Sequence, residues 1–97
     1  MTTVVYSDRA LANIERAFAL SREKNPVTAV TALVAIRSAV DTLAIHPLIG
    51  RRIERDLREL VISYGESGYI AVYRFVVASG EIRVLAIRHQ REIGFIP

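Results

Sequence analysis

Two short glycine-containing links divide the second half of this chain into three segments of β-type sequence. The segments are Arg58–Tyr64, Tyr69–Val77 and Ile82–Arg91, and all are rich in the β-branched and aromatic residues that suit a pleated sheet. The links, Gly65–Gly68 and Ala78–Gly80, are short enough to be hairpin connections. We therefore expect three consecutive antiparallel strands, and few small folds accommodate them.

The first half of the chain has helical periodicity instead. Apolar residues recur at helical spacing over 9–22 and again over 26–45. Ser7–Asp8 supplies a cap and a first-turn acid for the first helix, and Asn25–Pro26 supplies a cap and a first residue for the second. The polar link between the helices is short, which predicts a helical hairpin. Thr3–Tyr6 is a weak candidate for a strand that precedes both helices.

The expected order is β-α-α-β-β-β, in a single α+β domain that spans residues 1–97 with the helical hairpin packed on an antiparallel sheet. His46–Pro47 should end the second helix, and Leu48–Arg51 should form a turn in which Gly50 is free to take positive φ. If the hairpin closes tightly, Glu59 should lie opposite Arg74.

The second face of the sheet is expected to be covered as well. Tyr69–Tyr73 and Val84–Ile87 are apolar at successive positions, so both sides of these strands carry apolar side chains. A peptide from a partner and a loop or terminus of the chain itself are two ways to cover that face.

Composition excludes several classes of function. The chain has 97 residues, 52% of them hydrophobic, which fits one compact domain. It has no cysteine and two histidines, so we expect no disulfide, no metal site and no cofactor. We identify no apolar run of the roughly 20 residues that a membrane span needs and no signal-peptide pattern, so we expect a cytoplasmic protein with no membrane partner.

The basic residues are almost all arginine. Of the 13 lysines and arginines, one is Lys24, and the net charge is +3. Two explanations of this bias are equally good: a GC-rich genome, and a function in binding phosphate or an acidic partner. Arg58, Arg74, Arg88 and Arg91 recur near strand ends, where a rigid scaffold would hold their guanidinium groups. Arg58 and Arg74 can equally form structural pairs with nearby carboxylates.

The sequence from His46 to Phe95 resembles a known family. HPLIGR, followed by RELVISYGESGYIAVYRF and VLAIRHQREIGF, is similar to the RelE/ParE toxins of bacterial type II toxin–antitoxin systems, above all to the ParE-like "plasmid stabilisation" members. The resemblance implies a growth-inhibiting toxin that is neutralised by a cognate antitoxin encoded beside it. The antitoxin's C-terminal segment would wrap the toxin, and its N-terminal part would bind operator DNA, which the toxin would meet only indirectly.

The resemblance leaves two targets open. RelE-like members cut mRNA in the ribosomal A site, and this cleavage needs a general base, a general acid and cations over the phosphate. By position, Arg58 matches the second-strand arginine of these ribonucleases, and Arg88 or Arg91 matches the last-strand arginine. The family's lysines are missing, and Phe95 stands where a tyrosine is expected. His89 is the candidate for an acid or base.

Glu54 is a more distant candidate for the acid or base. ParE-like members poison DNA gyrase, and this needs no catalytic group. We therefore predict a gyrase-binding toxin that is not an enzyme. The predicted target-binding residues are Arg58, Arg74, Arg88, His89 and Arg91. The alternatives are a ribosome-dependent mRNA endonuclease with Arg58, Arg88, His89 and Arg91 as catalytic candidates, and a non-toxic family member that binds an antitoxin.

Overall fold

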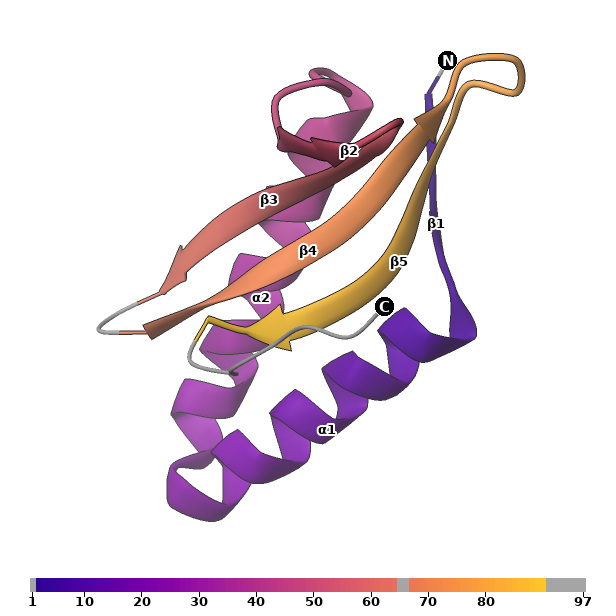
Figure 1. Ribbon diagram of the computed structural model, residues 1–97. Coiled ribbons are helices and arrows are strands. Elements are labelled where there is room, and N and C mark those ends of the chain that lie inside the picture. Colours follow the sequence, from indigo (N-terminus) through magenta and orange to yellow (C-terminus); the bar gives the residue numbers. More distant parts are fainter. Residues whose placement is uncertain (1, 65–66, 91–97) are drawn as a thin grey trace.

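In the computed structural model, residues 2–64 and 67–90 are described, and they form two helices packed on one face of a five-stranded sheet (Figure 1). The elements are β1 (Thr3–Tyr6), α1 (Asp8–Lys24), α2 (Pro26–Asp41), the 3-10 turn η1 (Thr42–Ala44), β2 (Arg51–Glu54), β3 (Leu57–Tyr64), β4 (Ser67–Val76) and β5 (Glu81–His89). The α+β architecture with a helical hairpin on a sheet is thus confirmed.

The sheet differs from the expected one in two respects. Its strand order is β1-β5-β4-β3-β2, and β1 runs parallel to β5 while the other pairs are antiparallel. The sheet is therefore mixed. The additional strand, β2, begins at Arg51, where the expected turn ends, in a segment for which the sequence predicted no strand. All four of its residues are exposed at the sheet edge, so β2 lacks the alternation by which a half-buried strand is recognised.

Capping side chains fix the helix starts as predicted. The Ser7 hydroxyl accepts a hydrogen bond from the Ala10 amide at 3.0 Å, and the Asn25 side chain accepts one from the Val27 amide at 3.0 Å. Pro26 occupies the first turn of α2, where its missing N–H costs nothing. These caps set the break between α1 and α2, so the two helices form the expected hairpin.

The main core lies between the helices and the sheet. Its buried residues come from every layer: Ala10, Ala32, Ile36, Val40, Leu43, Ile62, Tyr69, Ala71, Tyr73, Ile82, Val84 and Ile87. A second cluster of Ile70, Val72 and Ala86, with Leu57 against it, lies on the opposite face of the sheet. The alternation of β4 therefore sends apolar side chains to both faces, as its sequence predicted.

Helix α2 is apolar beyond its packed face. With η1 it forms a stretch, Pro26–Ala44, whose length and apolar composition would suffice to cross a membrane. The core helices of soluble proteins often have the same length and composition. Here α2 packs Ala29, Ile36 and Val40 into the protein. Its exposed side carries further valines, and this accounts for its high apolar content.

The register of the β3–β4 hairpin differs from our expectation. Glu59 lies opposite Val72, while Arg74 lies opposite Leu57 on one side and Arg83 on the other. The prediction that Glu59 faces Arg74 was wrong because β4 begins at Ser67 rather than Tyr69. An earlier start tightens the hairpin and shifts every cross-strand pair by two residues.

Candidate functional site

The structure divides the predicted site residues between the two faces of the sheet. Arg58 and His89 are the cross-strand partners of Tyr73 and Tyr69, two members of the core under the helices. Their side chains therefore lie on the helix side of the sheet. The side chains of Arg74 and Arg88 lie on the opposite side of the sheet, which we call the open face. The open face also carries Leu57, Glu59, Ile70, Val72 and Ala86. Arg91 lies outside the described residues.

Arg58 and Tyr73 together hold the loop of residues 46–50. The Tyr73 hydroxyl donates a hydrogen bond to the Pro47 carbonyl at 2.8 Å and accepts one from the Gly50 amide at 2.9 Å. The Arg58 Nη1 donates to the carbonyls of Leu48 at 3.2 Å and Gly50 at 2.9 Å. Four hydrogen bonds from one face of β3 and β4 thus fix the backbone of this loop, and Arg58 is occupied in holding it.

Gly50 is a glycine because Tyr73 passes close to it. A Cβ atom at Gly50 would lie 2.6 Å from both Cε1 and the hydroxyl oxygen of Tyr73, and 2.9 Å from the Glu59 carbonyl oxygen. Gly50 does not use its freedom to take positive φ, since among the described glycines the positive φ belongs to Gly80. Close approach, rather than backbone conformation, requires the missing side chain.

The environment of Tyr73 keeps its hydroxyl protonated. Burial raises the pKa of Tyr73, and this effect outweighs the Gly50 amide hydrogen bond and the nearby Arg58 charge, which lower the pKa. The hydroxyl therefore retains its proton at neutral pH and donates it to the Pro47 carbonyl. This geometry gives Tyr73 a structural role in the core, as most aromatic strand residues have.

A buried carboxylate lies on the open face. Glu59 is 9% exposed and forms ion pairs with Arg51 and with Arg88, the latter at 3.6 Å. The Arg88 side chain is 17% exposed, so its guanidinium group is held against Glu59 and largely withdrawn from solvent. This cluster was not predicted from the sequence. The sequence does contain a sign of it, because Glu59 is two residues from both Leu57 and Val61. In a strand this spacing places a glutamate on the same face as two apolar residues.

A pair of arginines stands at the other end of the open face. Arg74 and Arg83 are direct cross-strand partners, an arrangement of like charges that destabilises a sheet unless something compensates it. Arg83 pairs with Glu81 at 3.0 Å, and Arg74 approaches Asp56 at 4.0 Å. These exposed pairs leave both guanidinium groups accessible to an anion such as a phosphate or a carboxylate.

The candidate acids and bases are not assembled into one constellation within residues 2–64 and 67–90. His89 packs edge-on against Tyr69, with ring centroids 5.3 Å apart, on the helix side of the sheet. Glu59 lies on the open face, and Glu54 is exposed on β2. The sheet therefore separates His89 from Glu59. The described part of the chain also has no group of three or more histidines and carboxylates that could hold a metal ion.

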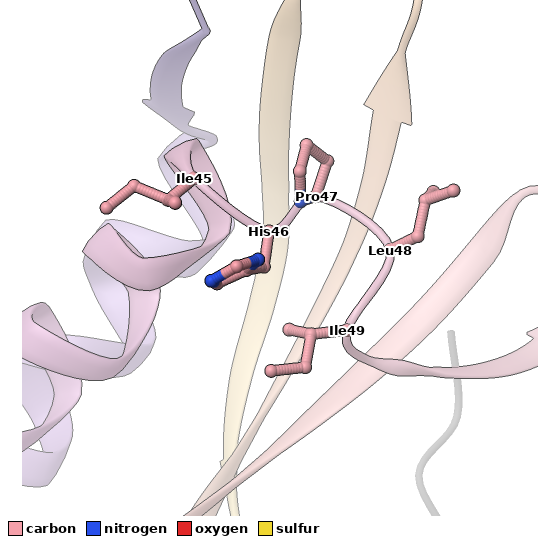
Figure 2. A pocket seen from close by; sticks show the side chains of 5 residues that line it. All are labelled: Ile45, His46, Pro47, Leu48 and Ile49. Atoms are coloured by element: carbon pink, nitrogen blue, oxygen red, sulfur yellow. The ribbon is translucent and has the colours of Figure 1, made fainter.

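The 46–50 loop and the residue before it form an open, apolar groove. Its volume is about 480 Å³, and Ile45, His46, Pro47, Leu48 and Ile49 line it. Figure 2 shows the side chains of His46 and Ile49 on the same side of the loop, while Ile45 and Leu48 project at its two ends. Large aliphatic side chains are thus displayed to solvent by a loop whose backbone is firmly held.

The sequence as a whole places the chain in a family. It belongs to the ParE toxin family, because a family model described as the ParE toxin of the type II toxin–antitoxin system parDE matches residues 4–94. This assignment confirms the resemblance to RelE/ParE toxins that the sequence suggested.

Curated relatives and solved structures agree with this assignment. Toxin RelE3 of Caulobacter vibrioides is 32% identical over 92 residues, covering 95% of this chain and 98% of that protein. Toxin RelE2 of the same organism is 34% identical over 89 residues, covering 92% and 96%. The chromosomal ParDE system of P. aeruginosa superposes with a TM-score of 0.73 at 20% identity, over 92% of this chain and 96% of that one.

A second solved structure shares the fold. The intact E. coli RelBE toxin–antitoxin complex matches with a TM-score of 0.64 at 16% identity, over 95% of this chain and 100% of that chain. The protein is thus a toxin of a type II toxin–antitoxin system with the RelE/ParE fold.

Proposed function

We propose that this toxin inhibits growth by binding and poisoning DNA gyrase, with no chemistry of its own. The separation of His89 from Glu59 by the sheet is the observation that carries this proposal. Cleavage of RNA needs a base and an acid within reach of the same phosphate, and arginines do not deprotonate near neutral pH. A binding toxin needs neither group.

The target-binding residues that we propose are Arg58, Arg74, Arg88, His89 and Arg91, and of the two on the open face Arg74 is the more accessible. Arg74 is 41% exposed and stands beside Arg83, so it is suited to contact an acidic surface. Arg88 contributes through its ion pair with Glu59, and His89 is the last residue of β5. Arg91 stays in the proposed set and lies outside the described residues. Arg58 would act indirectly, by holding the 46–50 loop.

A cognate antitoxin is the second proposed partner. The two solved structures described above, ParDE and RelBE, are toxin–antitoxin systems. We therefore expect a protein encoded beside this toxin whose C-terminal segment wraps it and whose N-terminal part binds operator DNA. The complex would form in the cytoplasm, where gyrase also acts.

An mRNA endonuclease is the second candidate function. It is favoured by the names of the curated relatives, RelE3 and RelE2, and by the guanidinium groups of Arg74 and Arg88 on one face, which suit a phosphate. In that case His89 would have to reach the same phosphate as these arginines. A non-toxic protein that only binds an antitoxin is the third candidate.

Inhibition of DNA supercoiling by the purified toxin tests the proposal. We expect the toxin to block gyrase and the antitoxin to relieve the block, while ribosomes programmed with mRNA in the presence of the toxin show no codon-phased cuts. His89→Gln keeps a side chain that can hydrogen-bond a target but removes the acid or base, so it should leave the inhibition within about twofold of wild type. Normal supercoiling together with mRNA cleavage that His89→Gln abolishes would refute the proposal in favour of the ribonuclease. Neither effect, with no growth arrest, would favour the non-toxic candidate.

A further inference from the structure

The loop and the strand that follows it carry a series of exposed aliphatic side chains. Ile45 is 75% exposed, Leu48 and Ile49 are each 59% exposed, and Ile53 on β2 is 44% exposed. We call these four residues, with Arg52 and Arg55, the loop–β2 surface. Single exposed aliphatic residues are common, but here four lie within nine positions and three of them line the groove, which makes this segment a candidate binding surface.

This surface is held in shape before any partner arrives. Tyr73 fixes Pro47 and Gly50, and Arg58 fixes the carbonyls of Leu48 and Gly50. The Ile49 amide also donates to the His46 carbonyl at 3.2 Å, which closes the turn. A loop that is already ordered loses little conformational entropy on binding, so its contacts contribute more fully to affinity.

The charge of the surface selects an acidic partner. Residues 45–55 contain three arginines and one glutamate, which leaves an excess of two positive charges. Arg51 is engaged with Glu59, whereas Arg52 donates to the Arg55 carbonyl and the guanidinium of Arg55 is exposed. Neither Arg52 nor Arg55 has an ion-pair partner among the described residues.

The aliphatic side chains favour a protein over a nucleic acid. Nucleic acids are held through phosphate contacts and through stacking on aromatic rings or guanidinium planes, and exposed isoleucine and leucine offer neither. A protein segment with acidic residues beside apolar ones would satisfy the arginines and cover the aliphatic side chains together.

We propose that gyrase docks on the loop–β2 surface through an acidic, amphipathic segment of one of its subunits; this rests on the proposed function. The surface adjoins the open face through Arg51, which leaves β2 to reach Glu59. Gyrase would therefore contact both the loop–β2 surface and the arginines of the open face, and the apolar contact would supply affinity that charge alone does not.

Two double variants and two matched controls test the proposal with purified gyrase. Leu48→Ser with Ile49→Ser removes the apolar contact, and Arg52→Glu with Arg55→Glu reverses the charge. Leu20→Ser, at a residue 54% exposed on α1, is the apolar control. Arg16→Glu with Arg22→Glu, on exposed positions of α1, is the charge control. Each variant is first checked for a wild-type circular dichroism spectrum.

We expect each loop–β2 double variant to weaken gyrase binding and supercoiling inhibition at least tenfold, and each control to change them less than threefold. For wild type, binding should weaken as salt rises, and for Arg52→Glu with Arg55→Glu it should weaken less. If wild type inhibits gyrase and the double variants inhibit equally well, the docking proposal fails while the proposed function stands. If wild type does not bind gyrase, both fail. If the double variants lose the antitoxin but keep gyrase, the occupant is the antitoxin and the docking proposal is overturned.

Discussion

Replacing Tyr73 with phenylalanine should release the 46–50 loop, since it deletes one oxygen atom and leaves the packed ring. The hydroxyl is both the donor to Pro47 at 2.8 Å and the acceptor from Gly50 at 2.9 Å. The ring is fully buried, so water cannot readily replace the lost oxygen. The variant therefore loses two hydrogen bonds and leaves the Gly50 amide and the Pro47 carbonyl without this partner.

The expected loss of stability is about 2–4 kcal/mol, because each net hydrogen bond is worth roughly 1 kcal/mol and a buried unpaired group costs about 1–3 kcal/mol. A domain of this size has only about 5–15 kcal/mol of stability in total, so the effect is large. Arg58 would still bind the Leu48 and Gly50 carbonyls, so the loop should loosen rather than unfold completely.

Urea denaturation followed by circular dichroism measures this loss, and hydrogen exchange at the Gly50 amide locates it. We expect a lower midpoint with an unchanged slope and faster exchange at Gly50. Tyr6→Phe is the matched control, since the Tyr6 hydroxyl makes no hydrogen bond within residues 2–64 and 67–90. A Tyr73→Phe variant within about 0.5 kcal/mol of wild type, a difference expected of an ordinary surface substitution, would refute this account of the loop.

Four further predictions concern stability. Gly50→Ala should cost about 1–3 kcal/mol and lower Tm, because the new Cβ would overlap Tyr73; an unchanged Tm would contradict the close approach. Arg55→Gly should raise stability by about 0.5–1 kcal/mol in urea denaturation, since Arg55 has a φ of 48°, a left-handed conformation that suits glycine. Glu59→Gln should lower the free energy of unfolding by about 1–3 kcal/mol, because it leaves the largely buried guanidinium of Arg88 without its carboxylate. Arg51→Ala, at an exposed guanidinium, should lower it by less than about 1 kcal/mol. Equal losses would show that Glu59 does not hold Arg88. Burial raises the pKa of Tyr73 in the folded state, so the Tyr73 hydroxyl contributes its full stability below pH about 10, and this contribution declines as the pH rises further. In urea denaturation at alkaline pH, the free energy of unfolding of Tyr73→Phe should therefore decline less steeply with pH than that of wild type.

The motifs that carried the family resemblance have an architectural role in the structure. HPLIGR contains Pro47 and Gly50, the two loop residues that bond to the Tyr73 hydroxyl, and Leu48, whose carbonyl accepts from Arg58. The arginine and the tyrosine that follow in the pattern are thus the residues that hold this loop. A pattern of this kind identifies the fold reliably, but it does not by itself locate the surface that binds a target.

The helical hairpin was predictable because local signals determine it. Ser7 and Asn25 cap their helices within three residues of themselves, and Pro26 begins α2 with a backbone angle that its own ring imposes. The hairpins of β3, β4 and β5 were likewise readable from their short links. Strand β2 was not, because an edge strand with every residue exposed carries no alternation.

The sequence by itself determined the family, the two helices and the strands other than β2, because capping, periodicity and turn length act over a few residues and survive in any context. The tertiary structure decided which side chains share a face. A two-residue shift in the start of β4 moved Arg74 from Glu59 to Leu57 and Arg83, and strand alternation sent Arg58 and His89 to the opposite side from Arg74 and Arg88. Face and register depend on how separate strands pair, and that pairing is set by contacts between residues far apart in the chain.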